Sequence, residues 1–366
     1  MFLGTGVNSP RFCRRMKIVI LNVAYMIIIG LLSHVWPFYR KSRTDNRKPG
    51  VAMKAAVLAA GLGTRLAPLT DIRPKPLLPV LNRPLLGLVL AQLEAAGCLQ
   101  VAVNTHHLAY QVQDFLQSQP WSFLLSVSLE PEILGTGGGL KQLGEILGNE
   151  PFLSVNGDIL TDLDLGEIYR RQQPDAIGTL VLHDSPRYNN VWVADGRVVS
   201  IGTTPPGTAA SPLAYTGVQV VDPKLRHYLP AAGQPYDLVQ AWRQALAAGE
   251  RLAYLKVSCQ FWQDIGSPEN YLAAHRRLLA GESPKLSNYF QSLADPLVGP
   301  GAQIGACVQF AGAVCLGAEV TVGEGACLQN TVVWDRAVIA PGVKLAGCIV
   351  ASGVRVKESA RGQVII

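Results

Sequence analysis

The sequence lacks the cysteine patterns of zinc-binding and disulfide-rich proteins. Its seven cysteines include no CxxC pair and no Cys/His cluster with the spacing of a zinc site. We therefore expect the cysteines to be small, buried apolar residues in a reducing compartment.

The sequence also lacks a basic folded body, although its formal net charge is +6. Residues 1–52 hold nine of the 32 Lys/Arg and one of the 26 Asp/Glu, which leaves 23 basic and 25 acidic residues from Met53 onward. Binding to a nucleic-acid backbone requires a basic face, so we expect no nucleic-acid partner. Apolar residues make up 49% of the chain, which is ample for a buried core.

Residues 1–52 form a leader whose role the sequence leaves open. Residues 18–39 carry no formal charge and are long enough to cross a bilayer. Either they anchor the protein, or translation starts at Met53 and the leader is misassigned. The body is expected in the cytoplasm in both cases, where nucleotides are, with a membrane partner only if the leader is real.

The body from Met53 alternates between strand-like and helix-like segments. Apolar strands are expected at 54–59, 99–104, 123–129 and 152–155, with helices at 84–96, 108–117 and 138–147. This order predicts an α/β domain over 53–280, with a Rossmann-like, mostly parallel sheet and helices on both faces. Ligands of such sheets bind at the carboxyl ends of the strands. Further β structure is expected over 177–221, and helices at 238–248 and 268–279.

A six-residue repeat follows a polar linker at 281–297. An apolar residue precedes a glycine at multiples of six, in Val298-Gly299, Ile304-Gly305, Leu316-Gly317 and Val322-Gly323. This period predicts a left-handed parallel β-helix of three to four coils over 298–366. Because solenoids stack through their flat faces and open ends, we expect a homo-oligomer.

A glycine-rich loop after the first expected strand is the clearest chemical signal. Gly61 and Gly63 allow backbone N–H groups to approach a phosphate closely. The loop has Leu66 where a dinucleotide-binding fingerprint has a third glycine, and it lacks the Gly-Lys-Ser/Thr of a P-loop. Arg65 can hold phosphate oxygens bidentately, and Lys75 lies between two prolines that stiffen its backbone.

These motifs closely resemble the signature of the sugar-phosphate nucleotidyltransferases (NDP-sugar pyrophosphorylases), many of which carry a C-terminal left-handed β-helix. The resemblance spans 53–366 and rests on Gly61-x-Gly63-Thr64-Arg65-Leu66-x-Pro68-Leu69-Thr70, Pro74–Val80, Leu134–Gly138, Asn156-Gly157-Asp158, Tyr215–Val218 and Trp262–Pro268. It implies Mg²⁺-dependent transfer of a nucleotidyl group from an NTP to a sugar 1-phosphate, with release of pyrophosphate.

The resemblance also implies roles for individual residues. The catalytic pair is Arg65, on the pyrophosphate, and Lys75, on the reacting phosphates, while Asp158 and Asp264 hold Mg²⁺ unless they merely cap turns. The implied nucleotide-binding residues are Ala60, Gly61, Gly63 and Thr64, with Gly135, Thr136 and Gly137 facing the base through backbone groups. Thr216 and Gly217 are implied to touch the sugar.

One departure from the family pattern bears on the sugar. Many members carry Glu-Lys-Pro where residues 200–206 have no lysine, and Arg187 or Asn190 are candidates to replace that lysine. The departure is similar to N-acetylmuramate-1-phosphate uridylyltransferases, whereas the β-helix and Leu-Gly-Thr-Gly-Gly resemble mannose- or heptose-1-phosphate guanylyltransferases. Both a guanylyltransferase and a uridylyltransferase acting on an amino-sugar 1-phosphate remain open.

Two other functions are alternatives to nucleotidyl transfer, and features of the sequence oppose each. An acyltransferase in the β-helix would need a histidine general base, and all six histidines precede residue 298. A noncatalytic regulatory or scaffold homologue typically loses the arginine or lysine of the first motif, and both Arg65 and Lys75 are present.

Overall fold

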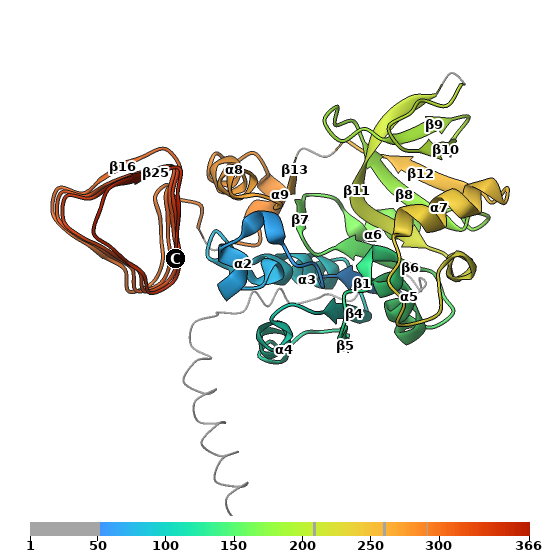
Figure 1. Cartoon of the computed structure of the whole chain (residues 1–366), viewed down its shortest axis with the longest axis horizontal. Coiled ribbons are helices and arrows are strands. Elements are labelled where there is room, and N and C mark those ends of the chain that lie inside the picture. The colour runs from blue at the N-terminus through green and yellow to red at the C-terminus, as the bar shows by residue number, and fades with distance from the viewer. Residues whose placement is uncertain (1–51, 208–209, 259–260, 291) are drawn as a thin grey trace, which may run out of the picture. The chain divides into compact units, whose positions relative to one another are not determined.

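The computed structural model describes residues 52–207, 210–258, 261–290 and 292–366 (Figure 1). The expected anchor at residues 18–39, Cys13 and Cys259 lie outside the described residues. Ala52–Ile366 forms one compact unit. Within the described ranges, no helix combines the length and apolar character needed to cross a membrane.

A nine-stranded sheet is the centre of the α/β domain, with the order β5-β4-β1-β6-β11-β8-β12-β10-β9. Its first four strands pair in parallel and confirm the expected ones: β1 (Lys54–Leu58), β4 (Gln100–Thr105), β5 (Leu124–Leu129) and β6 (Phe152–Asn156). The next strand, β11 (Ser211–Val221), runs antiparallel to β6 and to β8 (Gly178–His183). The far edge holds β12 (Leu252–Lys256), parallel to β8, then β10 (Arg197–Ile201) and β9 (Val191–Ala194).

Helices cover both faces of this sheet, as the sequence predicted (Figure 1). Ala55 and Val57 of β1 join the core beneath α3 (Leu85–Ala95), α4 (Ala109–Gln117) and α6 (Leu165–Arg170). Ala56 joins the opposite core, beneath α5 (Gly135–Leu147) and α7 (Leu238–Ala247). Successive side chains of a strand point to opposite faces, so an apolar run such as 55–57 can fill both cores.

Helix α5 begins at Gly135 rather than at Gly138, where the sequence analysis placed its start. Its first turn packs directly on another backbone segment, because a Cβ on Gly138 would overlap the carbonyl oxygen of Gln234. Glycine is therefore required there so that two backbone segments can approach closely. Helix propensity alone does not predict this requirement.

Short elements connect the sheet to the C-terminal region. They are α2 (Leu69–Ile72), β2 (Pro79–Val80), β3 (Arg83–Pro84), β7 (Ile159–Thr161), β13 (Trp262–Asp264) and α8 (Pro268–Leu279), followed by α9 (Pro284–Ser287). Helix α9 lies within the expected linker at 281–297. Its Leu286 is fully buried and its first turn is capped by Ser283, so this stretch packs against the body.

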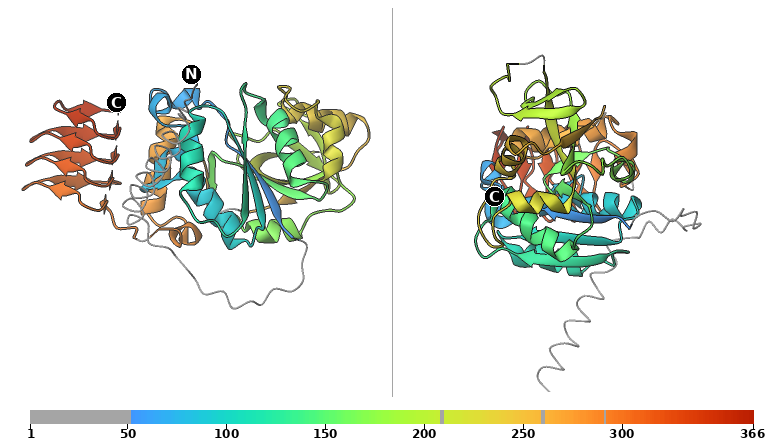
Figure 2. Two further views of the ribbon diagram at one scale, coloured as in Figure 1. Left: turned by 90° about the horizontal axis from the view of Figure 1, so that it is seen from below. Right: turned by 90° about the vertical axis from the view of Figure 1, so that its right-hand side faces the viewer.

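The C-terminal strands form a parallel β-helix with three sheets (Figures 1 and 2). One sheet holds β14 (Leu297–Val298), β17 (Cys315–Leu316), β20 (Val332–Val333), β23 (Ile349–Val350) and β26 (Val364–Ile365). The second holds β15 (Gln303–Ile304), β18 (Thr321–Val322), β21 (Val338–Ile339) and β24 (Arg355–Val356), and the third β16 (Gln309–Ala311), β19 (Cys327–Gln329), β22 (Lys344–Ala346) and β25 (Ala360–Arg361).

The six-residue spacing does not continue unchanged through the β-helix, because its coils differ in length. Leu297 pairs with Cys315, which is 18 residues further on, whereas Cys315 pairs with Val332, which is 17 residues further on. A coil that is one residue shorter shifts the repeat without breaking the stack. Val322 and Ile339, which pair between successive coils, both lie in the buried interior.

The cysteine expectation holds for most described cysteines. Cys98, Cys315 and Cys348 are buried, and burial raises the pKa of Cys98 to about 12. Cys307 is exposed on the first coil, and Cys327 is partly exposed.

Phe152 tests the core beneath α5 and α7. It is 1% exposed in that core, so Phe152→Ala should lower the free energy of unfolding by about 3–5 kcal/mol. Chemical denaturation of the full chain measures this. The control is Leu124→Ala on the edge strand β5, where Leu124 is 65% exposed and the loss should stay below about 0.5 kcal/mol. Equal losses in both variants would contradict the assignment of Phe152 to the core.

Candidate active site

Asp158 and Asp264 lie side by side because two short strands hold them there. Asp158 follows β6, and Asp264 is the last residue of β13, which pairs antiparallel with β7. The Ile265 N–H donates to the Asp158 carbonyl oxygen over 3.1 Å. The two carboxylates that the sequence predicted as metal ligands are therefore brought together by the fold.

Lys75 lies against both carboxylates. Its Nζ is 2.7 Å from Asp158 Oδ2 and 3.8 Å from Asp264 Oδ1, and only 8% of its side chain is exposed. An ammonium taken out of water needs such partners, because its desolvation is costly. The Lys75 ammonium thus neutralises part of the negative charge of both acids.

Arg65 reaches the same place from the solvent side. Its guanidinium is 3.8 Å from Asp264 Oδ2, while 72% of its side chain is exposed. An exposed ion pair of this length adds little stability. Most of the guanidinium's donors therefore remain available to a phosphate ligand.

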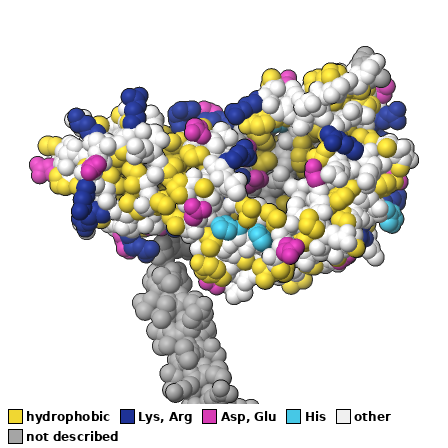
Figure 3. Space-filling model, in the orientation of Figure 1, with side chains coloured by type: hydrophobic (Ala, Val, Ile, Leu, Met, Phe, Trp, Pro, Cys, Tyr) yellow, Lys and Arg dark blue, Asp and Glu magenta, His cyan; other side chains and the backbone are white. Residues whose placement is uncertain are grey.

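The glycine loop before Arg65 leaves its backbone open on one side. Gly63 has φ 67°, and a Cβ there would lie 2.8 Å from Thr70 Cγ2, so only glycine fits. Gly61 has no atom within 4 Å of a Cβ position, and Gly61 and Thr64 are exposed. Ala60 is buried at the start of the loop. The face hollowed beside these elements carries both basic and acidic side chains (Figure 3).

A buried network that the sequence analysis missed supports this loop. Asn104 Oδ1 accepts from the Ala59 N–H over 2.6 Å, and Asn104 Nδ2 donates to Glu130 Oε1 over 2.7 Å. Glu130, which is 1% exposed, also accepts from the Leu134 N–H over 2.9 Å. The network joins the carboxyl ends of β1, β4 and β5 to the start of α5. The available signal was Asn104 at the end of one predicted strand and Glu130 directly after another.

Two polar groups of the loop expected to face the base are already hydrogen-bonded within the protein. The Gly137 N–H donates to the Tyr236 carbonyl oxygen over 2.9 Å, and the Thr136 hydroxyl accepts from the Leu238 N–H over 3.2 Å. Tertiary packing therefore uses the Gly137 N–H, and contact of this loop with a base stays a prediction. Gly135 and Thr136 remain exposed.

Thr216 and Gly217, which the sequence analysis predicts to touch the sugar, are buried. The Thr216 hydroxyl donates to Val181 O over 2.9 Å, and its carbonyl accepts from Trp262 Nε1 over 2.9 Å. A Cβ on Gly217, which has φ 83°, would overlap Ile159. Both residues thus position neighbouring groups of the site, and the Thr216 hydroxyl is used in a hydrogen bond within the protein.

Arg187 is exposed, and two aromatic side chains connect it to the strand that carries Asp264. Its guanidinium lies 5.4 Å from the Tyr188 ring, and Tyr188 packs edge-on against Trp262 at 5.3 Å. The Arg187 charge also favours the ionised form of Asp264, which lies two residues after Trp262. The sequence-predicted substitute for the missing lysine is therefore within electrostatic reach of the site.

The pKa of Asp264 is raised, chiefly because the carboxyl is buried. Lys75 opposes the rise, Asp158 adds to it, and Arg65 and Arg187 oppose it with smaller effects. Positive charge beside Asp264 thus favours its ionised form against the effect of burial.

A divalent cation such as Mg²⁺ fits this donor set. Mg²⁺ is typically bound by one or two carboxylates together with water and substrate phosphates. No group of three or more His, Cys, Asp or Glu side chains converges anywhere in the described part of the chain. The remaining ligands at Asp158 and Asp264 would therefore come from water and from the substrate.

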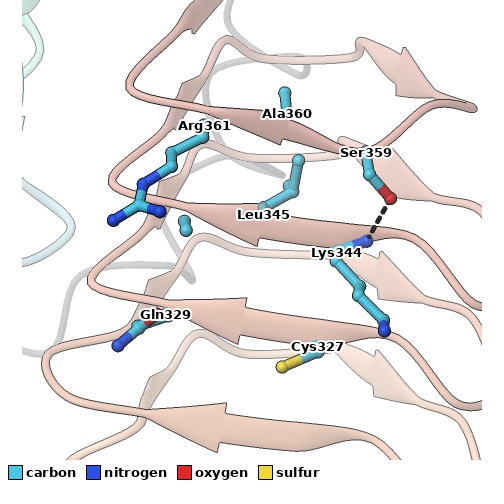
Figure 4. A pocket seen from close by; sticks show the side chains of 8 residues that line it. Cys327, Gln329, Lys344, Leu345, Ser359, Ala360 and Arg361 are labelled. Carbon is cyan, nitrogen blue, oxygen red and sulfur yellow. Dashed lines mark hydrogen bonds between the residues drawn. The ribbon is translucent and has the colours of Figure 1, made fainter.

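A second concavity lies on an outer face of the β-helix, with a volume of about 440 Å³ (Figure 4). Lys344 and Arg361 line it, and Ser359 Oγ accepts from the Lys344 N–H over 2.9 Å. None of the predicted site residues contributes to it, so it is separate from the carboxylate pair.

Residues 54–281 match the family model for nucleotidyl transferases. The chain belongs to the nucleotidyl transferase family. This confirms the family and the enzyme class that the motifs implied.

Three curated relatives show the range of the family around this chain. A UTP–glucose-1-phosphate uridylyltransferase of Synechocystis is 28% identical, over 80% of this chain and 86% of the relative. A mannose-1-phosphate guanylyltransferase of Mycobacterium tuberculosis is 29% identical, over 81% of this chain and 82% of the relative. An N-acetylmuramate α-1-phosphate uridylyltransferase of Neisseria meningitidis is 35% identical, over 47% of this chain and 77% of the relative.

Two of these matches extend beyond the nucleotidyl transferase domain. The Synechocystis and Mycobacterium alignments cover at least 80% of the 366 residues, which is more residues than precede the end of the nucleotidyl transferase domain at 281. Both alignments therefore continue past that domain. The Neisseria alignment is shorter and more identical.

Solved structures confirm the fold of the α/β domain. HddC of Yersinia pseudotuberculosis, solved with GMP-PN, has a TM-score of 0.53 and 22% identity, over 62% of this chain and 99% of that chain. A UDP-glucose pyrophosphorylase of Acinetobacter has a TM-score of 0.54 and 22% identity, over 65% of this chain and 97% of that chain.

Asp264→Asn should stabilise the protein at neutral pH. A raised folded-state pKa means that ionisation of Asp264 costs folding free energy, and stability falls as the pH rises from the ordinary Asp value of about 4 through the folded-state pKa. The variant should therefore melt roughly 1–3 °C higher at pH 7–8, and the gain should vanish below about pH 4.

Thermal unfolding across that pH range measures the effect. Asp195→Asn, at an exposed turn, is the control and should not shift the melting temperature. A variant of Asp264 that melts lower than the parent at neutral pH would contradict the cost assigned to this buried carboxylate.

Proposed function

We propose that the protein transfers a nucleotidyl group from an NTP to a sugar 1-phosphate, with Mg²⁺ held by Asp158 and Asp264. The observation that carries this proposal is the buried Lys75 ammonium, 2.7 Å from Asp158 and 3.8 Å from Asp264. It lies beside an exposed glycine loop and Arg65, which supply phosphate-binding groups.

The proposed reaction is an in-line displacement at the α-phosphorus. An oxygen of the sugar 1-phosphate forms the new P–O bond, and the bond to the β-phosphate bridging oxygen breaks, so pyrophosphate leaves with the electron pair. The attacking phosphate is already ionised, so no general base is needed. Positioning and charge neutralisation therefore provide most of the rate enhancement.

The chain's own cations divide this work. Lys75, fixed in a partly desolvated position, stabilises negative charge on the reacting phosphates more strongly than a solvated lysine would. Arg65, with its exposed guanidinium, holds the leaving pyrophosphate, and backbone groups of Ala60, Gly61, Gly63 and Thr64 hold the NTP phosphates. When bound, Mg²⁺ would supply further neutralisation of the phosphate oxygens.

Gly135 and Thr136 are proposed to border the base, since both are exposed at the start of α5. Thr216 and Gly217 are proposed to shape the sugar subsite indirectly, through Trp262 and the turn after β6.

GTP with mannose 1-phosphate is the first substrate pair we propose, because two mannose-1-phosphate guanylyltransferases, of Mycobacterium tuberculosis and Arabidopsis thaliana, align with 81% and 84% of this chain. UTP with an amino-sugar 1-phosphate is the second. It is supported by the missing lysine at 200–206 and by the 35% identical Neisseria relative.

A substrate panel tests the reaction class. The full chain with Mg²⁺ is incubated with each common NTP against mannose, glucose and amino-sugar 1-phosphates, and pyrophosphate release is measured. We expect release with one NTP and one sugar class, and its loss by at least about 100-fold in Lys75→Met, which removes the buried charge. Release with no pair would favour the noncatalytic alternative.

Arg187→Ala tests the replacement for the missing lysine. Loss of one phosphate contact should raise KM for the sugar 1-phosphate about tenfold and change KM for the NTP less than about twofold. Steady-state kinetics with each substrate varied in turn measures both. The exposed Arg197→Ala in β10 is the control and should change neither constant. Equal increases in both KM values for Arg187→Ala would refute the assignment.

A cytoplasmic location and a homo-oligomer are also proposed. The first is supported by the nucleotide substrate. The second is supported by the first coil of the β-helix, where Val298 and Ile304 are 42% and 44% exposed. Apolar residues on an open coil favour association with a second copy.

A further inference from the structure

Contacts with the β-helix hold the segment that carries Lys75. The Arg73 guanidinium lies 4.7 Å from the centre of the Trp334 ring, and it donates to Ser352 Oγ over 3.2 Å. Trp334 and Ser352 follow strands β20 and β23 of one β-helix sheet. Arg73 is only two residues before Lys75, so these contacts act on the backbone next to the proposed catalytic lysine.

Helix α8 makes the second contact with this segment. The Tyr271 hydroxyl donates to the Pro79 carbonyl oxygen and accepts from Trp334 Nε1, the latter over 3.0 Å. His275 Nε2 lies 3.2 Å from the Leu81 N–H, and burial lowers the pKa of His275 to about 4, so the neutral ring accepts that hydrogen bond. Trp334 and Tyr271 thus form one buried link between the β-helix, α8 and the segment.

Asn82 fixes the far end of the segment to the β-helix. Its Nδ2 donates to the Leu316 carbonyl oxygen over 2.8 Å, and its Oδ1 lies 3.2 Å from Cys315 Sγ. Residues 73–82 are therefore attached to the β-helix at both ends, and Lys75 lies between the attachments.

The apolar packing reinforces the same connection. Leu66, Leu78 and Leu85 around the segment share one buried cluster with Trp334 and Tyr271. Trp334 is 2% exposed and is among the largest fully buried side chains of the described residues. Because a packed core resists small displacements, movement of Trp334 would be transmitted to the segment.

Lys75 needs this restraint because its charge acts over a short distance. A displacement of about 1 Å at a site of this kind can cost a large part of the rate. The prolines on either side stiffen the backbone locally but do not fix where the segment lies. That position is set by contacts at Arg73, Pro79 and Asn82.

We infer that Trp334, Arg73 and Tyr271 are positioning residues for Lys75, so that the β-helix takes part in nucleotidyl transfer as well as in assembly. The inference rests on the proposed function for the role of Lys75. It does not require the β-helix to touch either substrate.

Trp334→Phe in the full chain tests the inference. The variant keeps an aromatic ring beneath Arg73 and removes the indole hydrogen bond to Tyr271. We expect kcat to fall about tenfold while KM for the NTP changes less than about twofold. The reason is that a displaced Lys75 would stabilise the transition state less while the NTP still binds. Arg73→Met is the second variant, with the same expectation, should Trp334→Phe fail to fold.

Trp121→Phe is the matched control. Its indole donates to the Leu116 carbonyl oxygen over 3.0 Å, and its ring packs against Phe115 and Phe123. The Trp121→Phe substitution also removes one indole hydrogen bond, but it leaves the contacts of residues 73–82 unchanged. We expect its kcat to equal that of the parent.

Direct Mn²⁺ binding, measured by the loss of the free-ion EPR signal, gives a readout besides activity. Lys75 Nζ and a divalent cation compete for Asp158 Oδ2, so a loosened Lys75 frees that oxygen. Trp334→Phe and Arg73→Met should therefore bind Mn²⁺ about two- to tenfold more tightly without nucleotide. General damage to the site would weaken binding instead.

The outcomes separate the two proposals. Mn²⁺ affinity and kcat both equal to the parent's in the folded variants would overturn the positioning inference, as would a lower kcat with weaker Mn²⁺ binding. Mn²⁺ binding that survives Asp158→Asn would instead show that the proposed metal site is wrong.

Discussion

The interaction on which the rest of the site depends is the ion cluster of Lys75, Asp158 and Asp264. A lysine with 8% of its side chain exposed is stable only beside negative charge, and the two acids tolerate their proximity because the ammonium lies against both. The cluster is thus a compact arrangement of charge that a phosphate ligand and a cation can enter by exchanging partners.

Each member of this cluster comes from a different part of the fold. Asp158 is placed by the end of the buried strand β6, and Asp264 by the pairing of β13 with β7. Lys75 is placed by a segment that the β-helix and α8 hold from the other side. The C-terminal β-helix is therefore part of the framework of the site. The Asn104–Glu130 network supports the glycine loop from within the sheet.

The glycines show how packing and ligand binding compete for the same residue type. Gly63 is needed for its left-handed conformation and its contact with Thr70, and Gly137 and Gly138 allow α5 to approach the 234–238 segment. Gly61 alone among these has open space around its Cβ position. A glycine in a motif therefore indicates close approach of some group, and only the surrounding atoms decide whether that group is a ligand or another part of the chain.

Short-range patterns in the sequence were enough to predict the strands around 54–58 and 100–105 and the β-helix repeat, and to select Arg65, Lys75, Asp158 and Asp264 as candidate site residues. These depend on periodicity, on turn residues and on the few residue types that bind phosphate or a hard cation. The antiparallel position of β11, the burial of Thr216, the occupied Gly137 N–H and the contacts of Trp334 with Tyr271 were decided by the tertiary structure. Those features depend on which distant segments meet, and no local pattern specifies that partner.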